Sequence, residues 1–417
     1  MSAPTSDRTT VDEPRFREAL RTLPRRVWVV SLGILVNQVG NFLPVFIVLY
    51  LIERGHSAGT AGLVLGAAGL GNVLGNAFGG HLADRIGRRR TIVLSAVATS
   101  GLVAAVPHLS SVPTLFAVVG LAGVTSHVYR PAAAAVLVDS VETNRQRLAA
   151  FGVFRAAMNI GAALGGVLGG LLASVSYTGL FLGNAATCLL FGVVIALLLR
   201  DAPARDPEQE VADTPVEQSG GYRTALRDRI FLRFLLMTVF AEFVYVQSTV
   251  GVPLHVSDVG LTARHFGLLI GLNGLLVLAL ELPATALVSS YRPEHVLAVG
   301  NLLVGLGLAL TGLVDEMALL AVMVMVWTVG EMITSSVAYA YLGGLTPSGM
   351  VGRYQGLHGV AYTIGTGAGP IVGGAAYALS PSALWIVIAV AGLLSAQLAL
   401  PPRRRERVEA PREVATW

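Results

Sequence analysis

Residues 152–170 read GVFRAAMNIGAALGGVLGG, and residues 356–374 read GLHGVAYTIGTGAGPIVGG. Five glycines hold the same places in both stretches, at a constant offset of 204 residues. They are Gly152, Gly161, Gly165, Gly169 and Gly170 in the first stretch, and Gly356, Gly365, Gly369, Gly373 and Gly374 in the second. Glycine at about every fourth residue gives a helix a flat face that another helix can approach closely. The second half of the chain is therefore predicted to repeat the fold of the first.

The composition excludes a soluble protein. Of the 417 residues, 54% are hydrophobic and only 13% are Asp, Glu, Lys or Arg, whereas soluble domains carry roughly a quarter of such charged residues. The single cysteine, Cys188, excludes a disulfide framework. The arginines are spread over loops and tails instead of forming one patch, which argues against a nucleic-acid partner.

Hydropathy predicts twelve membrane-spanning helices, since a span needs about 20 apolar residues. They cover residues 27–51, 61–81, 91–108, 113–138, 149–173, 179–199, 231–255, 265–289, 296–314, 317–344, 354–379 and 383–400. The expected organisation is an N-terminal tail (1–26), a six-helix bundle (27–199), a polar linker (200–230), a second six-helix bundle (231–400) and a C-terminal tail (401–417).

The arginines predict the orientation, because the chain has no lysine. Counted over tails and loops, 24 arginines fall on one side of the predicted membrane, and the opposite side has only Arg54 and Arg264. Positively charged loops stay in the cytoplasm. We therefore expect a multi-pass protein of the cell membrane with both termini and the linker in the cytoplasm.

The loop after the second span reads GHLADRIGRRRTI over residues 80–92. This stretch resembles the loop signature of the major facilitator superfamily, G-x-L-a-D-R-x-G-R-[RK]. The matching positions are Gly80, Leu82, Asp84, Arg85, Gly87, Arg88 and Arg89. The resemblance implies an all-α membrane protein of twelve helices in two pseudo-symmetric six-helix bundles, related by an axis along the membrane normal as in this superfamily. It also implies secondary transport by alternating access.

The resemblance gives this loop a conformational role, as a latch that stabilises the outward-open state. Gly80 is expected to let a neighbouring helix come close. Asp84 would face the positive N-terminal end of span eleven, and Arg88 would pair with Asp139 at the cytoplasmic end of span four. The expected latch consists of Gly80, Asp84, Arg85, Arg88 and Asp139. The alternative is that the arginines serve topology alone.

Residues 152–170 also resemble the antiporter signature of the superfamily, g-x8-G-x3-G-P-x2-G-G, with Gly166 in place of the proline. Residues 356–374 carry the whole pattern, including Pro370. The resemblance favours export in exchange for protons, as in the bacterial drug:proton antiporters. Val119 stands where proton-coupled members have an arginine in span four, so coupling has to use other residues.

Polar side chains inside the spans predict the substrate site, because a charge at the bilayer centre costs about 2.5–3.5 kcal/mol on insertion scales. Two stripes have helical spacing: Thr238, Glu242, Tyr245 and Thr249 in span seven, and Glu331, Thr334 and Ser335 in span ten. The repeat offset maps Glu242 onto Asn37 or Gln38, and Glu331 onto Ser126 or His127. One central cavity is therefore expected to be lined by Asn37, Gln38, Asn41, His127, Arg130, Glu242, Tyr245, Trp327 and Glu331.

Within this cavity, Arg130 would be a fixed cation, and Glu242 or Glu331 would carry the proton. The alternative for each glutamate is a static hydrogen bond or ion pair that fixes helix packing. Arg155 and Glu281 lie in spans five and eight, which the resemblance places at the interface between the halves. We expect an interdomain ion pair that breaks and reforms during transport, and a static pair is an equal alternative.

The sequence thus predicts a proton-coupled exporter of small amphipathic or drug-like molecules. Its expected partners are the substrate, protons and the lipid bilayer, and it is expected to act as a monomer. An uptake symporter is the first alternative, and a non-transporting receptor or scaffold is the second. No enzyme activity, cofactor, metal site or nucleic-acid partner is expected, since no nucleotide-binding loop, His-x-x-x-His pair or nucleophile elbow occurs.

Overall fold

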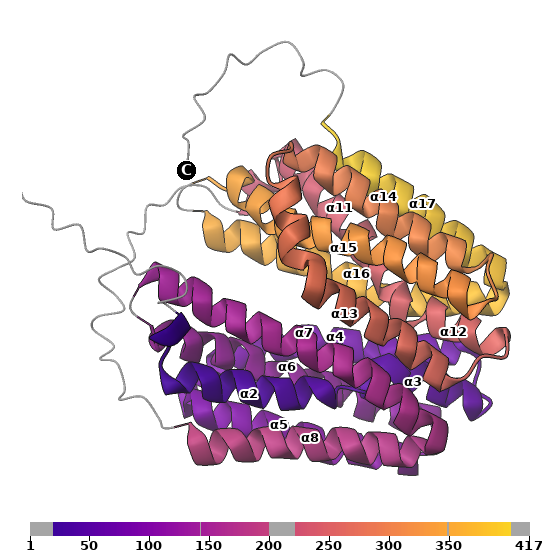
Figure 1. The fold of residues 1–417 in the computed structure, drawn as a ribbon, viewed down its shortest axis with the longest axis horizontal. Helices are drawn as coiled ribbons and strands as arrows, with labels where there is room; N and C mark the ends of the chain where they lie inside the picture. Colours follow the sequence, from indigo (N-terminus) through magenta and orange to yellow (C-terminus); the bar gives the residue numbers. More distant parts are fainter. Residues whose placement is uncertain (1–19, 142, 200–221, 348–349, 402–417) are drawn as a thin grey trace, which may run out of the picture. The chain divides into compact units, whose positions relative to one another are not determined.

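The computed structural model describes residues 20–141, 143–199, 222–347 and 350–401, and these residues form helices and no strand (Figure 1). Residues 1–19, 200–221 and 402–417, which hold most of the predicted tails and linker, lie outside the described part. Among the described residues, eleven helical segments are long and apolar enough to cross a membrane. Helix α16, 29 residues long, is the twelfth of spanning length. The prediction of an all-α protein with twelve membrane-spanning helices is confirmed.

In the first half of the chain the helices are α2 (Arg25–Val39), α3 (Leu43–Glu53), α4 (Ala58–Ile86), α5 (Arg88–Ala105), α6 (Val112–Asp139), α7 (Asn144–Val175) and α8 (Tyr177–Leu198). In the second half they are α10 (Tyr222–Ala225), α11 (Arg229–Tyr245), α12 (Gly251–Asp258), α13 (Ala263–Val288), α14 (Pro293–Thr311), α15 (Met317–Leu345), α16 (Val351–Leu379) and α17 (Pro381–Ala399). Short 3-10 turns cover Val106–His108 and Val246–Thr249.

The first span of each half is interrupted. The stretch predicted as one helix over residues 27–51 consists of α2 and α3, and the stretch over 231–255 consists of α11, a 3-10 turn and α12. Pro44 lies in the first turn of α3, and Pro253 lies in the first turn of α12. Proline has no backbone N–H, so it fits at a helix start and breaks a helix interior.

Two compact units make up the described chain. Residues 20–43 and 70–199 form the first unit, and residues 44–69 and 222–401 form the second. Residues 44–69 therefore pack with the second half of the chain. The rings of Phe46 and Phe266 meet edge to face at 5.6 Å between centroids. A Cβ atom placed on Gly374 would lie 2.9 Å from the Cα atom of Gly62, so α16 and the start of α4 touch through their backbones.

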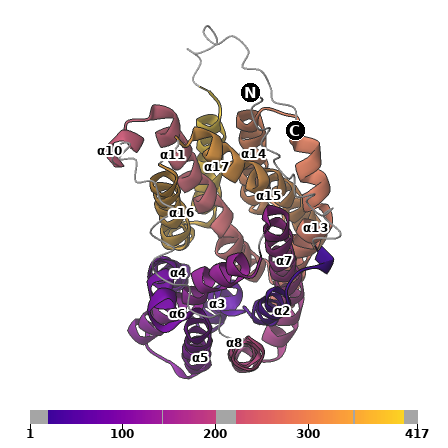
Figure 2. The same ribbon diagram turned by 90° about the vertical axis from the view of Figure 1, so that its left-hand side faces the viewer.

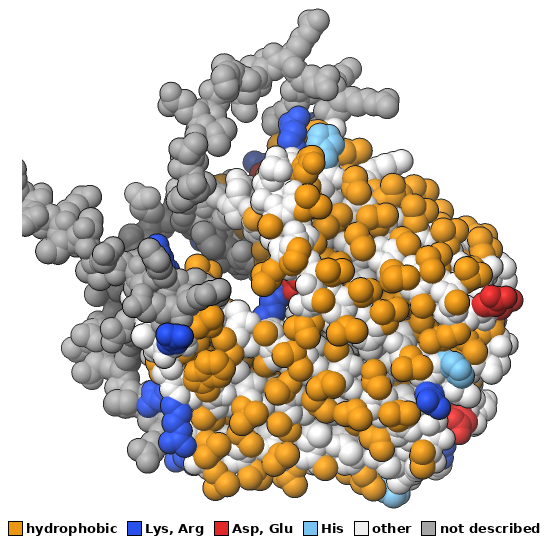
Figure 3. Space-filling model, in the orientation of Figure 1, with side chains coloured by type: hydrophobic (Ala, Val, Ile, Leu, Met, Phe, Trp, Pro, Cys, Tyr) orange, Lys and Arg blue, Asp and Glu red, His pale blue; other side chains and the backbone are white. Residues whose placement is uncertain are grey.

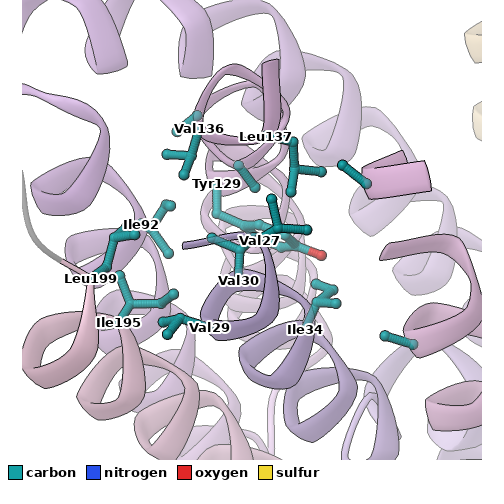
Figure 4. Packing of buried hydrophobic residues seen from close by; sticks show 14 of the residues in the cluster. Val27, Val29, Val30, Ile34, Ile92, Tyr129, Val136, Leu137, Ile195 and Leu199 are labelled. Atoms are coloured by element: carbon teal, nitrogen blue, oxygen red, sulfur yellow. The ribbon is translucent and has the colours of Figure 1, made fainter. Parts of the chain in front are cut away.

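The core of the first unit joins α2, α5, α6, α7 and α8. Val27, Ile34 and Leu137 are fully buried in it (Figure 4). Tyr129 of α6 packs edge to face on Phe191 of α8, with ring centroids 5.3 Å apart. In the second unit, α11, α14, α15, α16 and α17 lie side by side (Figure 2), and Phe231 of α11 lies 4.1 Å from the ring of Tyr354.

Large apolar side chains also cover the outer faces of the helices (Figure 3). Val175, Leu197 and Leu287 are more than two-thirds exposed, at 86%, 77% and 71%. Apolar patches of this extent on a protein surface mark a membrane or partner interface. Here they lie on helices of spanning length, so the outer faces are suited to lipid.

Candidate functional site

A cavity of about 260 Å³ lies inside the second unit, between α11, α14, α15, α16 and α17. Two carboxyl groups, those of Glu242 and Glu331, line it. Its other polar lining residues are Thr238, Tyr245, Asn301, Thr334, Ser335, Tyr339, His358, Tyr362 and Ser395. The rest of the wall is apolar, so the two carboxyl groups share a small and largely apolar space.

Helical periodicity brings the predicted polar stripes to this cavity. Thr238, Glu242 and Tyr245 are four and three residues apart on α11, which places them on one face. The second stripe, at residues 331, 334 and 335 of α15, also lines the cavity. Thr249, which follows α11 in the 3-10 turn, is outside the lining set.

Glu331 accepts hydrogen bonds from two other helices. The hydroxyl of Tyr245 on α11 donates to its Oε1 atom at 2.8 Å. The side-chain amide of Asn273 on α13 donates to its Oε2 atom at 2.9 Å and also reaches Thr328 Oγ1 at 3.0 Å. Both oxygens of the carboxylate are thus held, and a hydrogen bond to an ionised group is stronger than one between neutral groups.

The carboxyl group of Glu242 has no hydrogen bond to a described side chain or backbone group. Glu331 is near enough to act on it electrostatically. The backbone of α16 presses on this part of α11, since a Cβ atom placed on Gly365 would lie 2.6 Å from the Cβ atom of Glu242. The packing of α16 therefore fixes the backbone of α11 at Glu242, and the Glu242 carboxyl group lines the cavity.

One predicted cavity residue, Trp327, lies elsewhere. Its side chain is 2% exposed and is not part of the cavity wall. The ring packs edge to face behind Tyr245, at 6.2 Å between centroids. Residue 327 is four positions before Glu331 on α15, but the bulky indole is turned into the helix packing and supports the tyrosine.

The sequence analysis did not predict six polar residues of the site. They are Asn273 on α13, Asn301 on α14, Tyr339 on α15, His358 and Tyr362 on α16, and Ser395 on α17. Asn273 and Asn301 are isolated amides within apolar runs, and that isolation was the available signal. His358 is buried, stacks on Phe234 at 5.5 Å and meets Tyr339 edge to face at 5.7 Å.

The predicted site residues of the first half lie in the first unit. Asn37 and Gln38 are on α2, and His127 and Arg130 are on α6. His127 Nδ1 lies 3.1 Å from Ser126 Oγ. Arg130 is exposed, as is Asn41, which follows α2. The single cavity predicted from both halves would join residues of both units, and it stays a prediction.

The repeat is visible in side-chain packing. A Cβ atom placed on Gly161 would lie 2.6 Å from the Cβ atom of Gln38, which is the distance found between Gly365 and Glu242. Both pairs are related by the offset of 204 residues. The α2–α7 contact of the first half is thus repeated as the α11–α16 contact of the second, and the polar residue of the pair changes from an amide to an acid.

Not every glycine of the repeated stretches makes such a contact. Gly165 would bring a Cβ atom to 2.9 Å from the carbonyl oxygen of Gln38. Gly152 and Gly356, at the start of the two stretches, have open space around them. The close packing expected from the repeat therefore begins at Gly161 and Gly365.

At the start of α5, Arg88 forms an ion pair with Asp139, the last residue of α6. Arg88 also donates to the carbonyl oxygen of Ala135 at 3.1 Å, and Arg89 donates to that of Ala196. Asp84 and Arg85 are exposed, and their side chains have no hydrogen bond or ion pair to a described residue. The contact expected between Asp84 and span eleven would join the two units, so it stays a prediction.

Gly80 makes no close helix contact within the described first unit, and its expected role in the latch stays a prediction. A Cβ atom on Gly80 would have Pro131 Cβ at an ordinary 4.0 Å as its nearest neighbour. The close approach of α4 to α6 is made by Gly71, Gly75 and Gly79, where a Cβ atom would come within about 3 Å of Val124, His127 or Val128. These glycines are four residues apart and share one helix face. Gly80 is one residue further along the helix and points in another direction.

Arg155 and Glu281 belong to different units, and their pairing also stays a prediction.

Twelve spanning helices, a repeated half and an internal cavity with two carboxyl groups are the features of a secondary transporter. The profile of the Major Facilitator Superfamily matches residues 30–263 and 243–416. These matches cover more than half of the chain, so the protein belongs to this superfamily and is a multi-pass membrane transporter.

Curated relatives match along most of their length. The uncharacterised MFS-type transporter YqjV of Bacillus subtilis is 27% identical over 352 residues, which covers 83% of this chain and 85% of the relative. A Na(+), Li(+), K(+)/H(+) antiporter of Planococcus maritimus is 27% identical, with 78% and 83% of the two chains covered. The multidrug resistance protein MdtH of Aeromonas salmonicida is 23% identical, with 93% and 98% covered.

Solved structures share the fold at low sequence identity. A POT family transporter crystallised with a thioalcohol-conjugated peptide superposes with a TM-score of 0.75 at 14% identity and covers 91% of this chain and 98% of that one. The nucleoside transporter NupG superposes with a TM-score of 0.74 at 15% identity and covers 90% of this chain and 98% of that one. At such identities the likeness concerns the fold alone.

Proposed function

We propose that this transporter exports small amphipathic or drug-like molecules in exchange for protons, with Glu242 and Glu331 as the proton-carrying pair. The observation that supports the proposal is their placement in one small, largely apolar cavity, near the middle of the spans Arg229–Asp258 and Met317–Leu345. A transporter with no proton or cation to move has no use for two carboxyl groups there, because each ionised one costs a few kcal/mol in a membrane interior.

The two acids have different hydrogen-bonding neighbours and therefore different roles. Like charges in one site oppose each other, so a single proton shared by the pair relieves the repulsion. Glu331 is the better anion, since Tyr245 and Asn273 donate to both of its oxygens. Glu242 has no such donor and accepts the proton. A cationic or hydrogen-bond-donating substrate that enters the cavity replaces the proton, which is the exchange that antiport requires.

The named relatives support antiport and drug export. One is an antiporter of alkali cations and protons, and another is a multidrug resistance protein. We infer that the arginine-rich ends of the helices, the linker and both termini lie in the cytoplasm. In this arrangement the Arg88–Asp139 pair belongs to a cytoplasmic latch, and Arg155 and Glu281 form an interdomain ion pair that breaks and reforms as the protein switches between states.

Exchange of an alkali cation for a proton is the second candidate. The Tyr245 hydroxyl is bonded to Glu331, and Asn273 links Glu331 to the hydroxyl of Thr328. Oxygen atoms of these kinds are the ligands that hard cations take. This candidate differs from the first in its substrate and keeps the same proton-carrying pair.

Proteoliposomes with a trapped pH dye test both candidates. Adding ethidium, a fluorescent amphipathic cation, to one side should drive protons toward that side through the reconstituted protein. Sodium chloride added in its place tests the alkali-cation candidate. Proton movement in the same direction as ethidium would show a symporter, and no proton movement with either cation would reject the proposal. Liposomes without protein are the control.

A further inference from the structure

Asn301 is a buried amide in the middle of α14, on the wall of the cavity that holds Glu242 and Glu331. The residue is 6% exposed. Its Nδ2 atom is buried and has no hydrogen-bond partner in the described chain. Buried polar groups in native proteins are nearly always hydrogen-bonded, so each exception calls for an explanation such as a bound molecule.

The hydroxyl groups of the same wall do not satisfy the amide. Thr238 donates to the carbonyl oxygen of Phe234 at 3.0 Å, and Thr334 donates to that of Gly330 at 2.9 Å. Ser395 of α17 donates to the carbonyl oxygen of Met237 at 3.0 Å. These three oxygen atoms could still accept a hydrogen bond, but none of them accepts one from Asn301 Nδ2, which remains without a partner among the described residues.

Helix α14 cannot shift to bring Asn301 to another partner. A Cβ atom placed on Gly305 would lie 2.9 Å from the Cα atom of Gly392 on α17. On the other side, a Cβ atom on Gly307 would lie 2.7 Å from the backbone nitrogen of Trp327 on α15. The helix is therefore fixed against two neighbours, and the unpaired amide is a stable feature of the cavity.

We propose that Asn301 is a substrate-recognition residue whose amide donates a hydrogen bond to a carbonyl or ether oxygen of the transported molecule. The proposal rests on the function proposed above and narrows its substrate class to molecules that carry such an acceptor in addition to a cationic group. The cationic group lies at Glu242 and Glu331, and the acceptor points toward α14. The cavity is near the lower end of the roughly 300–1,000 Å³ usual for ligand sites, so it holds a compact group.

A pair of matched ligands separates the acceptor from the cation. We choose 4-acetylbenzyl-trimethylammonium and 4-ethylbenzyl-trimethylammonium, which share charge and shape and differ in one carbonyl oxygen. Their affinities for the purified full-length protein are measured by calorimetry, for the wild type, Asn301→Leu and Asn184→Leu. Asn184 is the control, because it is equally buried but its Oδ1 atom already accepts a hydrogen bond from the backbone nitrogen of Leu43 at 3.0 Å.

The wild type and Asn184→Leu should bind the acetyl compound about five- to tenfold more tightly than the ethyl compound, the usual contribution of one uncharged hydrogen bond. Asn301→Leu should bind both compounds equally. Its melting temperature without ligand should be unchanged or higher, because an unpaired buried amide has been replaced by an apolar group of similar size. Asn184→Leu should melt at a lower temperature.

Two results would overturn the inference without affecting the proposed function. In the first, Asn301→Leu still binds the acetyl compound more tightly than the ethyl compound. In the second, the wild type binds both compounds equally, which would mean that the amide holds only water. In both cases proton exchange driven by ethidium would continue, and the proposed function would stand. Absence of binding of both compounds together with absence of ethidium–proton exchange would reject the function and the inference with it.

Discussion

The hydroxyl of Tyr245 on α11 donates a hydrogen bond of 2.8 Å to Oε1 of Glu331 on α15. The two residues come from the two polar stripes of the second unit, and Asn273 of α13 completes the arrangement from a third helix. The ring of Tyr245 also packs edge to face against the indole of Trp327, and this contact holds the tyrosine ring in place. A carboxyl group of the proposed exchange site is thus positioned by three helices.

Removing the Tyr245 hydroxyl should slow proton-coupled transport. A hydrogen bond to a charged group contributes about 1.5–3 kcal/mol, so Tyr245→Phe is expected to lower the exchange rate about ten- to hundredfold. The measurement is ethidium-driven proton flux in proteoliposomes. Tyr339→Phe is the control, because Tyr339 also lines the cavity but is exposed and is not bonded to either acid. Equal loss in both variants would contradict a specific role for the Tyr245–Glu331 bond.

Replacing the acid that accepts the proton should separate binding from coupling. Glu242→Gln keeps the size of the side chain and cannot exchange a proton, so ethidium should still bind while proton-driven accumulation disappears. Accumulation is followed by ethidium fluorescence under an imposed pH gradient. Glu316→Gln is the matched control, since Glu316 is an exposed acid at the start of α15. Wild-type dependence on the pH gradient in Glu242→Gln would remove the assignment.

Adding one methyl group at Gly365 should disturb the site without changing any polar residue. The new Cβ atom would lie 2.6 Å from both the Glu242 Cβ atom and the carbonyl oxygen of Val239, so α16 must move away from α11. We expect Gly365→Ala to lower the melting temperature and to reduce transport strongly.

Gly356→Ala, in the same helix, provides the comparison for Gly365→Ala. Open space surrounds Gly356, and alanine favours a helix over glycine by up to about 1 kcal/mol. This variant should therefore be as stable as the wild type or slightly more stable. Similar destabilisation by both substitutions would argue against close α11–α16 packing.

The ion pair of Arg88 and Asp139 should contribute modestly to stability and more to turnover. Their side chains are 32% and 19% exposed, so a double-mutant cycle of Arg88→Ala and Asp139→Asn should give a coupling of about 1 kcal/mol or less. If the pair belongs to a latch, both variants should change the transport rate with little change in substrate affinity. Arg90→Ala, which removes an exposed arginine of the same loop, should leave both quantities unchanged. Equal loss of affinity in Arg88→Ala would indicate a binding role.

The sequence predicted the helices and two sides of the cavity because these depend on local periodicity. Apolar runs long enough to span a bilayer predicted twelve segments, and each of them is helical in the structure. The spacing of Thr238, Glu242 and Tyr245 placed them on one face of α11, whatever lies next to that face. The repeat in the sequence also matched Gly161 with Gly365. It could not predict which side chains these two glycines contact.

Several assignments required the tertiary structure, because they depend on how each helix is rotated and which helix lies beside it. The packing turns Trp327 behind Tyr245 and brings Asn273 to Glu331. It brings Gly79, and not the adjacent Gly80, into close contact with α6. Asn301 became a candidate only through its unpaired amide. A single polar residue in an apolar run has the same sequence pattern whether it is paired, exposed or free for a ligand, and the neighbouring helices determine which of these it is.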